Sequence, residues 1–198
     1  MYDWRKMNER QRKQTIELRL RAHAPIHSVP HWDNGPNQYM ISATCFEHKS
    51  HIGYSPERMA DFEQQLLDTL EAHCGKVYSW CLLPNHYHAL VYTNDVKQLV
   101  TKLGQLHGRT SFKWNGEENQ RGRKTWFRAV ETVMKSERHF WVTFNYIHNN
   151  PVKHEYVEKW QDWPFSSANL WLEKLGRKRM KEIWREYPPL DYGEDWDV

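Results

Sequence analysis

Apolar residues recur along the chain with two different periods. Some segments are rich in strand-forming residues or apolar on both faces, and they predict strands over residues 39–46, 76–83, 86–92 and 125–133. Others repeat apolar residues every three or four positions, and they predict helices over residues 55–75, 95–112 and 136–149. Ser55 and Ser136 are the expected N-caps of two of these helices, and Pro151 is expected to end the last one.

The order of these elements, β-α-β-β-α-β followed by a helix, is typical of a ferredoxin-like sandwich. We therefore predict an α+β fold in which an antiparallel sheet carries helices on one face. An irregular basic arm is expected over residues 1–38, the sandwich domain over 39–155 and a helical C-terminal extension over 156–198. Residues 114–124 are polar and predict a loop within the sandwich domain.

Composition limits the class of protein. A chain of 198 residues fits one domain with extensions and is long enough to bury a core. It has no apolar run near the ~20 residues of a membrane span, and its polar N-terminus does not resemble a secretory signal. We therefore expect a soluble intracellular protein. Three cysteines without C-x-x-C spacing argue against a disulfide scaffold and against a cysteine zinc site.

Positive charge is clustered, although the net charge is only +3. Clusters of this kind are typical of phosphate binding, but each of them taken alone is as well explained by a solvated face. The residues of these clusters that are predicted to contact nucleic-acid phosphates are Arg5, Lys6, Arg10, Arg12, Lys13, Arg121, Arg123, Lys124, Arg177, Lys178 and Arg179. Tryptophans near the clusters are candidates for stacking on unpaired bases: Trp4, Trp114, Trp126, Trp171 and Trp184. Most of these large rings are nevertheless expected to pack in the core.

The first candidate site is the pair His86 and His88. Residues two apart on a strand point to the same face, so two imidazoles here can share one divalent ion. Twelve histidines in the chain make such a pair common by chance, and two structural histidines are the alternative. A strand of a sheet would hold both ligands rigidly, which favours the metal site.

The second candidate site is Tyr146 with Asn150, which share a helix face because they are four positions apart. Phe140, Phe144 and Ile147 form the buried stripe of this helix, so Tyr146 is predicted to lie off its centre and to reach the sheet. Asn150 offers an amide oxygen as a third ligand, although its position before a proline places it near the helix end. A half-buried packing tyrosine is the alternative.

Together these residues predict phosphoryl-transfer chemistry. A phenol with a pKa of about 10 is a weak nucleophile at neutral pH, and a divalent ion assists it by polarising the phosphoryl oxygens. The product would be a covalent phosphotyrosine, which preserves the bond energy for rejoining. Histidine and carboxamide ligands suit Mg²⁺ or Mn²⁺ better than a closed structural zinc site.

Three segments of the chain resemble the REP-associated tyrosine transposases, which are single-tyrosine members of the HUH superfamily. The segments are Leu82–Val91 (LLPNHYHALV), Tyr146–His154 (YIHNNPVKH) and Asp162–Ser167 (DWPFSS). Pro30–Asp33 also resembles a segment found before the first strand in this family, and the similarity spans roughly residues 29–170. Three ordered motifs at family-like separations are far more specific than the histidine pair alone.

The resemblance implies a ferredoxin-like catalytic core, metal ligation by His86 and His88 completed by Asn150, and attack by Tyr146. The implied substrate is single-stranded DNA with repetitive extragenic palindromes folded as hairpins, each with a short conserved tetranucleotide at its foot. Cleavage would leave a 5′-phosphotyrosine and a free 3′-OH. We accordingly expect a cytoplasmic, nucleoid-associated bacterial protein, and its long C-terminal extension favours a monomer.

Two other functions remain open from the sequence. A domesticated DNA- or RNA-binding protein with little catalysis would use the aromatic sheet to bind unpaired bases. A metal-dependent phosphodiesterase would activate water, leave no covalent adduct and tolerate loss of the Tyr146 hydroxyl. The presence of both histidines and the tyrosine favours the transposase-type nuclease over the pure binder.

Overall fold

The computed structural model describes residues 7–21 and 35–193. Arg5, Lys6 and the Pro30–Asp33 segment lie outside the described residues.

Within the described residues, four strands form one antiparallel sheet in the order β2-β3-β1-β4. Their bounds are β1 (Asn37–Thr44), β2 (Lys76–Leu82), β3 (His86–Thr93) and β4 (Val130–Val133). This order is that of a ferredoxin-like sheet, so the predicted fold class is confirmed. The prediction for β4 was too long, because residues 125–129 are not part of the strand; they meet the end of β1 and the residues after it through an isolated bridge between Cys45 and Trp126 and a hydrogen bond from the Phe127 amide to the Thr44 carbonyl.

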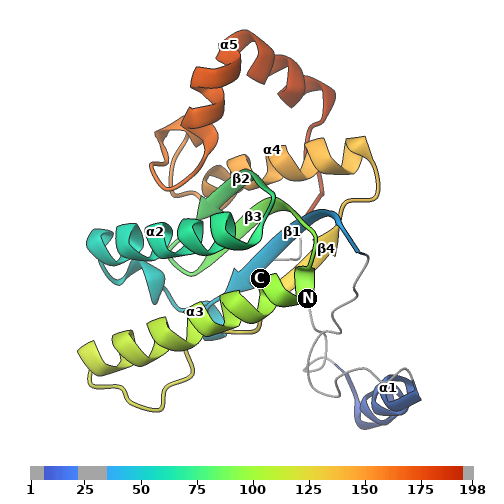
Figure 1. The fold of residues 1–198 in the computed structure, drawn as a ribbon, viewed down its shortest axis with the longest axis vertical. Helices are drawn as coiled ribbons and strands as arrows, with labels where there is room; N and C mark the ends of the chain where they lie inside the picture. The colour runs from blue at the N-terminus through green and yellow to red at the C-terminus, as the bar shows by residue number, and fades with distance from the viewer. Residues whose placement is uncertain (1–6, 22–34, 194–198) are drawn as a thin grey trace.

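Helices α2 (Pro56–His73) and α3 (Val96–Glu117) cover one face of the sheet, as the element order predicts (Figure 1). Ser55 caps α2 by accepting a hydrogen bond from the Arg58 amide. The prediction that residues 114–117 belong to a loop was wrong, since α3 continues through them. Trp114, only 1% exposed and edge-on to Phe62, explains the continuation, because another helical turn buries its ring in the core.

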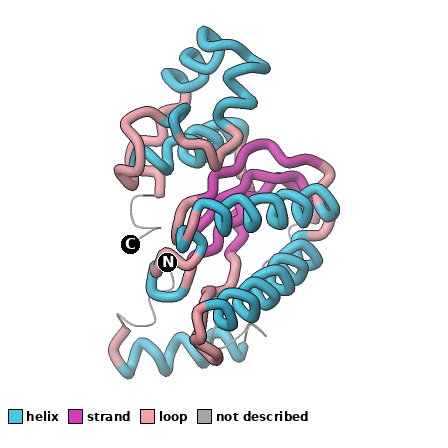
Figure 2. Tube along the Cα trace, turned by 90° about the vertical axis from the view of Figure 1, so that its left-hand side faces the viewer, coloured by secondary structure: helices cyan, strands magenta, loops and turns pink. Residues whose placement is uncertain are grey.

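Helices α4 (Glu137–Lys153) and α5 (Ala168–Glu186) lie on the opposite face, so the sheet is enclosed between two helical layers (Figure 2). The prediction of helices on one face was therefore wrong, because apolar residues on both faces of the strands, such as Met40 and Leu90 on this side, also need cover.

The prediction that Pro151 ends α4 was wrong. Pro151 lies inside the last turn, which is closed by a 3.0 Å hydrogen bond from the His154 amide to the Asn150 carbonyl. Asn150 remains helical although it precedes a proline, because the packing of the buried α4 outweighs the local preference there.

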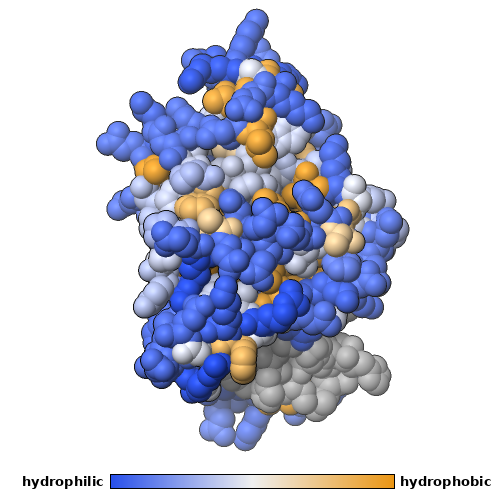
Figure 3. Space-filling view, turned by 60° about the vertical axis from the view of Figure 1, so that its left-hand side comes forward, coloured by the Kyte–Doolittle hydropathy of each residue, from blue (hydrophilic) through white to orange (hydrophobic). Residues whose placement is uncertain are grey.

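Helix α5 changes direction at Gly176, whose φ of +77° is a left-handed value that glycine adopts without strain. Its exposed side is strongly polar, and small apolar patches interrupt the hydrophilic surface in the upper part of the molecule, where α5 lies (Figure 3). None of the helices within residues 7–21 and 35–193 combines the length and apolar character needed to span a membrane.

The prediction of an irregular arm was wrong for helix α1 (Glu9–Arg21). Asn8 and Gln11 exchange two hydrogen bonds of 2.9 Å, each side-chain oxygen accepting from the backbone amide of the other residue. This reciprocal arrangement is a capping box, and it begins the helix.

Candidate metal and tyrosine site

His86 and His88 lie on β3, which is hydrogen-bonded on both sides by β1 and β2. Their side chains point toward α4, whereas Tyr87 between them packs on the α2 and α3 face. Both imidazoles are buried, with 1% and 2% exposure, and their ring centroids are 5.1 Å apart. The two-residue period of the strand therefore places both rings together at the centre of the molecule.

Helix α4 brings the second pair of predicted residues to the same place. Asn150 Oδ1 lies 2.8 Å from His86 Nε2, and the Tyr146 ring centroid lies 5.3 Å from that of His88. The prediction placed Tyr146 off the buried stripe, yet it is only 2% exposed. The difference arises because α4 is covered both by the sheet and by the C-terminal extension, so most of its circumference is buried.

Each candidate imidazole is oriented through its Nδ1 atom. His86 Nδ1 lies 2.7 Å from Asn85 Oδ1, and His88 Nδ1 lies 2.7 Å from Ser42 Oγ. The Asn85 amide is itself oriented, because its Nδ2 donates to the His48 carbonyl and leaves Oδ1 as the acceptor. His86 Nδ1 must then carry the hydrogen, so Nε2 presents a lone pair, which is the tautomer that binds a metal.

The contact between His86 and Asn150 tests whether these residues fit a metal ion. With Nδ1 protonated, His86 Nε2 and Asn150 Oδ1 are two acceptors at 2.8 Å, an arrangement that becomes favourable when a cation lies between them. Two neighbouring ligands of an octahedral ion, each ~2.1 Å from it, are about 3 Å apart. Asn150 Nδ2 has no hydrogen-bond partner among the described residues. The donor set therefore fits a divalent ion.

A metal ion at this site would need the Asn150 carboxamide as a ligand, because no group of three or more His, Cys, Asp or Glu residues in the described parts of the chain is placed to hold a metal. A third imidazole is nevertheless close, since the ring centroids of His154 and His86 are 4.9 Å apart. No role was predicted for His154, although it ends one of the three motifs. Ser42 was not predicted either, because only the pairing of β1 with β3 brings it beside His88.

The end of the described chain covers the tyrosine. Tyr192 packs edge-on against Tyr146, and its hydroxyl lies 2.6 Å from Thr143 Oγ1. Gly193 lies flat against the phenol, since a Cβ atom there would be 2.5 Å from the Tyr146 ring. Lys153 donates to the Gly193 carbonyl over 2.6 Å and holds its ammonium group 5.2 Å from the centroid of the Tyr146 ring. Tyr192, Gly193 and Lys153 therefore cover Tyr146, which is 2% exposed.

The third motif is structural. Ser167 Oγ lies 2.8 Å from His148 Nε2 and accepts a hydrogen bond from the Trp80 amide, so it ties α4 to the edge of the sheet. Trp163 donates its indole hydrogen to the Leu82 carbonyl. Burial lowers the pKa of His148 to about 3, so its ring is neutral in this position. These contacts support the site without entering it.

The basic residues predicted to bind DNA have different surroundings. Those that extend into solvent are Arg10 and Lys13 on α1, Arg121 and Lys124 after α3, and Arg177, Lys178 and Arg179 on α5. Arg12 is half-buried on α1. Arg121 donates to the Phe112 carbonyl, Lys124 lies 4.5 Å from the centroid of the Phe46 ring, and Arg179 pairs with Glu182.

Of these residues, Arg123 is the one most engaged in side-chain hydrogen bonds within the protein. It is half-buried, and it donates to Asn115 Oδ1 and to Glu118 Oε2 over 2.9 and 2.7 Å. The pKa of Glu118 is lowered to about 2, and the hydrogen bond from Arg123 is the largest cause of this shift. We therefore expect Arg123 to hold its loop together, while α5 offers the more accessible positive charge.

A ferredoxin-like sheet that presents a His-x-His pair to a helical tyrosine resembles the arrangement that the three sequence motifs imply. The chain is 24% identical over 155 residues to a Haemophilus influenzae protein assigned as a REP-associated tyrosine transposase, covering 73% of this chain and 82% of that one. Its fold matches a solved REP-associated tyrosine transposase bound to a REP hairpin, with a TM-score of 0.56 and 15% identity over 83% of this chain and 90% of that one. No family model matches. The resemblance to REP-associated tyrosine transposases carried by the three motifs is therefore confirmed.

Proposed function

We propose that the protein is a metal-dependent endonuclease and strand transferase that acts on single-stranded DNA with REP-type hairpins. The observation that carries the proposal is the convergence of two side-chain pairs. His86 and His88 from the sheet meet Tyr146 and Asn150 from α4, with 2.8 Å between His86 Nε2 and Asn150 Oδ1 and 5.3 Å between the His88 and Tyr146 ring centroids. The solved relative bound to a REP hairpin supports the choice of substrate.

In the proposed reaction, the Tyr146 hydroxyl attacks the phosphorus of one phosphodiester. The bond from Tyr146 Oη to phosphorus forms, the bond from phosphorus to the 3′-oxygen breaks, and that oxygen leaves as a 3′-OH after taking up a proton. His86, His88 and Asn150 would hold Mg²⁺ or Mn²⁺, which supplies Lewis-acid stabilisation of the phosphoryl oxygens when bound. Lys153 brings a positive charge near the phenol, where it offsets negative charge that develops as the proton leaves.

The polarity of the adduct tests this reaction. Full-length protein is incubated with Mn²⁺ and a hairpin oligonucleotide labelled at either its 3′ or its 5′ end, and the products are separated on a denaturing gel. A 5′-phosphotyrosine transfers the 3′ label to the protein and leaves the 5′ label on a short free strand. Cleavage without any labelled protein would favour the water-activating phosphodiesterase.

The domesticated binding protein is the second candidate, and the burial of Tyr146 favours it. A tyrosine that is 2% exposed beneath Tyr192 and Gly193 is poorly placed for turnover in this conformation. Hairpin binding with neither cleavage nor adduct, under every metal condition, would support this function. We further propose that the protein acts as a monomer, since the C-terminal extension folds back on its own catalytic face.

Ser42→Ala is expected to weaken Mn²⁺ binding about 10- to 100-fold, because Ser42 fixes the ring of His88 through Nδ1 and such outer contacts orient metal ligands. Calorimetric titration of the DNA-free protein with Mn²⁺ measures this directly. Ser79→Ala is the matched control, because Ser79 is also buried in the sheet and its hydroxyl has no hydrogen-bond partner among the described residues. Equal affinities for the two variants would contradict a positioning role for Ser42.

Deleting residues 188–198 is expected to speed adduct formation about tenfold or more. The physical reason is that only molecules with an uncovered Tyr146 can accept a phosphate, and deletion removes the cover from every molecule. The initial rate of adduct formation at saturating hairpin measures the effect. Tyr192→Phe, which loses the hydroxyl contacts with Thr143 and His139 but keeps the ring, should give a smaller increase. An unchanged rate after deletion would mean that the cover does not limit access.

A further inference from the structure

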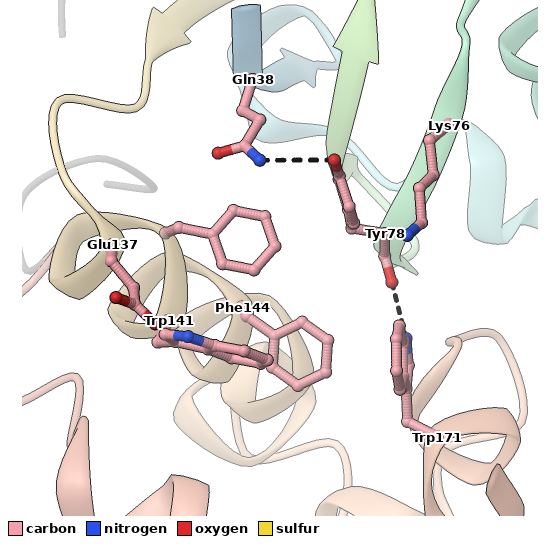
Figure 4. Close-up of a pocket in the computed structure, with 8 residues that line it drawn as sticks. Gln38, Lys76, Tyr78, Glu137, Trp141, Phe144 and Trp171 are labelled. Atoms are coloured by element: carbon pink, nitrogen blue, oxygen red, sulfur yellow. Dashed lines mark hydrogen bonds between the residues drawn. The ribbon is translucent and has the colours of Figure 1, made fainter. Parts of the chain in front are cut away.

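A cavity of about 460 Å³ opens between β2, α4 and α5 (Figure 4). Five of the residues that line it are aromatic: Tyr78, Phe140, Trp141, Phe144 and Trp171. Tyr146 follows Phe144 by two residues, or about 200° around the axis of α4, so the cavity lies across this helix from the tyrosine. It is therefore separate from the candidate metal and tyrosine site, and a ligand bound here would not contact the nucleophile.

The aromatic rings surround the hollow instead of stacking on one another. Neighbouring rings have centroids 4.9–5.4 Å apart and meet at 73–89°, in the order Tyr78, Phe140, Trp141, Phe144 and Trp171. The tyrosine and both tryptophans are half-buried and expose part of their rings, whereas the two phenylalanines are buried. Rings turned in this way offer their faces to a guest from several directions, which is the form of an aromatic cage.

Specific contacts hold the three half-buried rings in place. The register between β2 and β3 shifts at Tyr78, which makes it the extra residue of a β-bulge, and Gln38 donates to its hydroxyl over 3.3 Å. Trp171 is held from α5 by a 2.6 Å hydrogen bond from its indole to the Tyr78 carbonyl. Tyr187 stacks on Trp141 at 25°, with 6.2 Å between the ring centroids. Rings that are already ordered lose little entropy when a ligand binds.

The charged groups at the cavity favour a guest with one positive charge. Glu137 is exposed and lies one helical turn before Trp141, so its carboxylate is on the same face of α4 as that ring. The Tyr78 ring already attracts a cation, because Lys76 Nζ lies 4.8 Å from its centroid. Lys76 is exposed, so water and salt screen its charge and its repulsion of a bound cation is weak. An anion would instead meet aromatic faces and the Glu137 carboxylate, which repel it.

We propose that this cavity binds a small organic cation whose ammonium group carries alkyl substituents. The aromatic faces and Glu137 attract its positive charge, and its methyl groups pack against the half-exposed rings. An unsubstituted ammonium ion binds less well, because it is more strongly hydrated and has no methyl groups to bury. The cavity volume of about 460 Å³ falls in the range of small-molecule sites. The proposal does not depend on the proposed function.

The test follows choline binding to DNA-free, full-length protein labelled with fluorotryptophan. The control ligand is the neutral analogue of choline in which a carbon atom replaces the charged nitrogen. Fluorine NMR at constant ionic strength reports on each tryptophan, with Trp141 and Trp171 assigned from their Phe variants. We expect choline to shift these two resonances and to bind at least about tenfold more tightly than the neutral analogue. Trp184, which stacks on Trp160 and does not line the cavity, should not shift.

Substitutions identify the groups that hold the cation. Glu137→Gln removes the negative charge and should weaken choline binding about fivefold, and Trp171→Leu removes one wall and should weaken it about tenfold or more. Lys76→Gln removes a repelling charge, so it should strengthen choline binding up to about twofold. Trp184→Phe is the matched control, because Trp184 lies on the same helix outside the cavity, and it should bind choline as the native protein does.

Glu137→Gln and Lys76→Gln change exposed residues, so they test the site even if Trp171→Leu folds poorly. Equal or tighter binding of the neutral analogue would mean an apolar hollow without preference for a cation, and it would overturn the proposal. Choline that shifts neither Trp141 nor Trp171, or that shifts Trp184 as much as these two, would overturn it as well. Each of these results leaves DNA cleavage by Tyr146 to be judged by its own experiments.

Discussion

Tyr146→Phe is expected to reduce covalent adduct formation by at least about a thousandfold, because the variant has no oxygen atom with which to form the bond to phosphorus. Hairpin affinity should stay within about twofold of the native value, since the hydroxyl is needed for the chemical step and the phenyl ring still fills the same space. The measurement is the fraction of protein shifted on a denaturing gel after incubation with a 3′-labelled hairpin and Mn²⁺. Binding is followed separately in EDTA.

A second tyrosine provides the control for this substitution. Tyr156 follows α4 by three residues, is 41% exposed and packs against Trp163, away from the two histidines. Tyr156→Phe should form adduct at the native rate. If Tyr146→Phe still forms a covalent adduct, another side chain is the nucleophile and the assignment is wrong. If it cleaves the strand without an adduct, water performs the reaction and the phosphodiesterase is the better description.

The parts of the site that the sequence predicts are those set by local periodicity. A period of two residues places His86 and His88 on one face of β3, and a spacing of four places Tyr146 and Asn150 on one face of α4. These two rules bring the predicted residues together once α4 packs on the sheet. The element order did not predict that α4 covers the face opposite to α2 and α3, and this packing is what brings Tyr146 to the histidines. Whether these residues ligate a metal and attack DNA stays a prediction for the experiments above.

The remaining parts of the site depend on contacts between segments far apart in the chain. Ser42 reaches His88 only through the register of β1 against β3, which the alternation of side chains does not specify. The cover over Tyr146 comes from Tyr192 and Gly193, some 46 residues later, and its position is set by contacts with α4. Helix ends were also hard to predict, because the burial of Trp114 and the tertiary packing of α4 override local preference at Pro151.

The core between the sheet and helices α2 and α3 contains a histidine that should make the free energy of unfolding depend on pH below neutrality. His107 is 6% exposed, its ring is stacked 4.3 Å from Trp126, and its Nε2 lies 3.1 Å from the Tyr87 hydroxyl. Burial lowers its pKa from 6.5 to about 3. Between these two values the unfolded chain binds a proton that the folded protein does not bind, so the free energy of unfolding must fall as the pH falls.

The expected loss is about 1.4 kcal/mol per pH unit below the unfolded pKa, or roughly 2–3 kcal/mol at pH ~4.5, while stability above pH ~6.5 is unaffected by this group. His107→Phe keeps a flat ring against Trp126, and His107→Gln keeps a polar group near the Tyr87 hydroxyl, and neither side chain titrates. Urea unfolding at pH ~7 and ~4.5 gives the free energy of unfolding at each pH. We expect the difference between these two free energies to be about 2 kcal/mol smaller in both variants than in the native protein. The comparison does not depend on how much either substitution destabilises the protein at neutral pH, because each variant serves as its own reference. A difference as large as that of the native protein would mean that His107 takes up its proton within the folded core, and the acid sensitivity would then have to come from other groups.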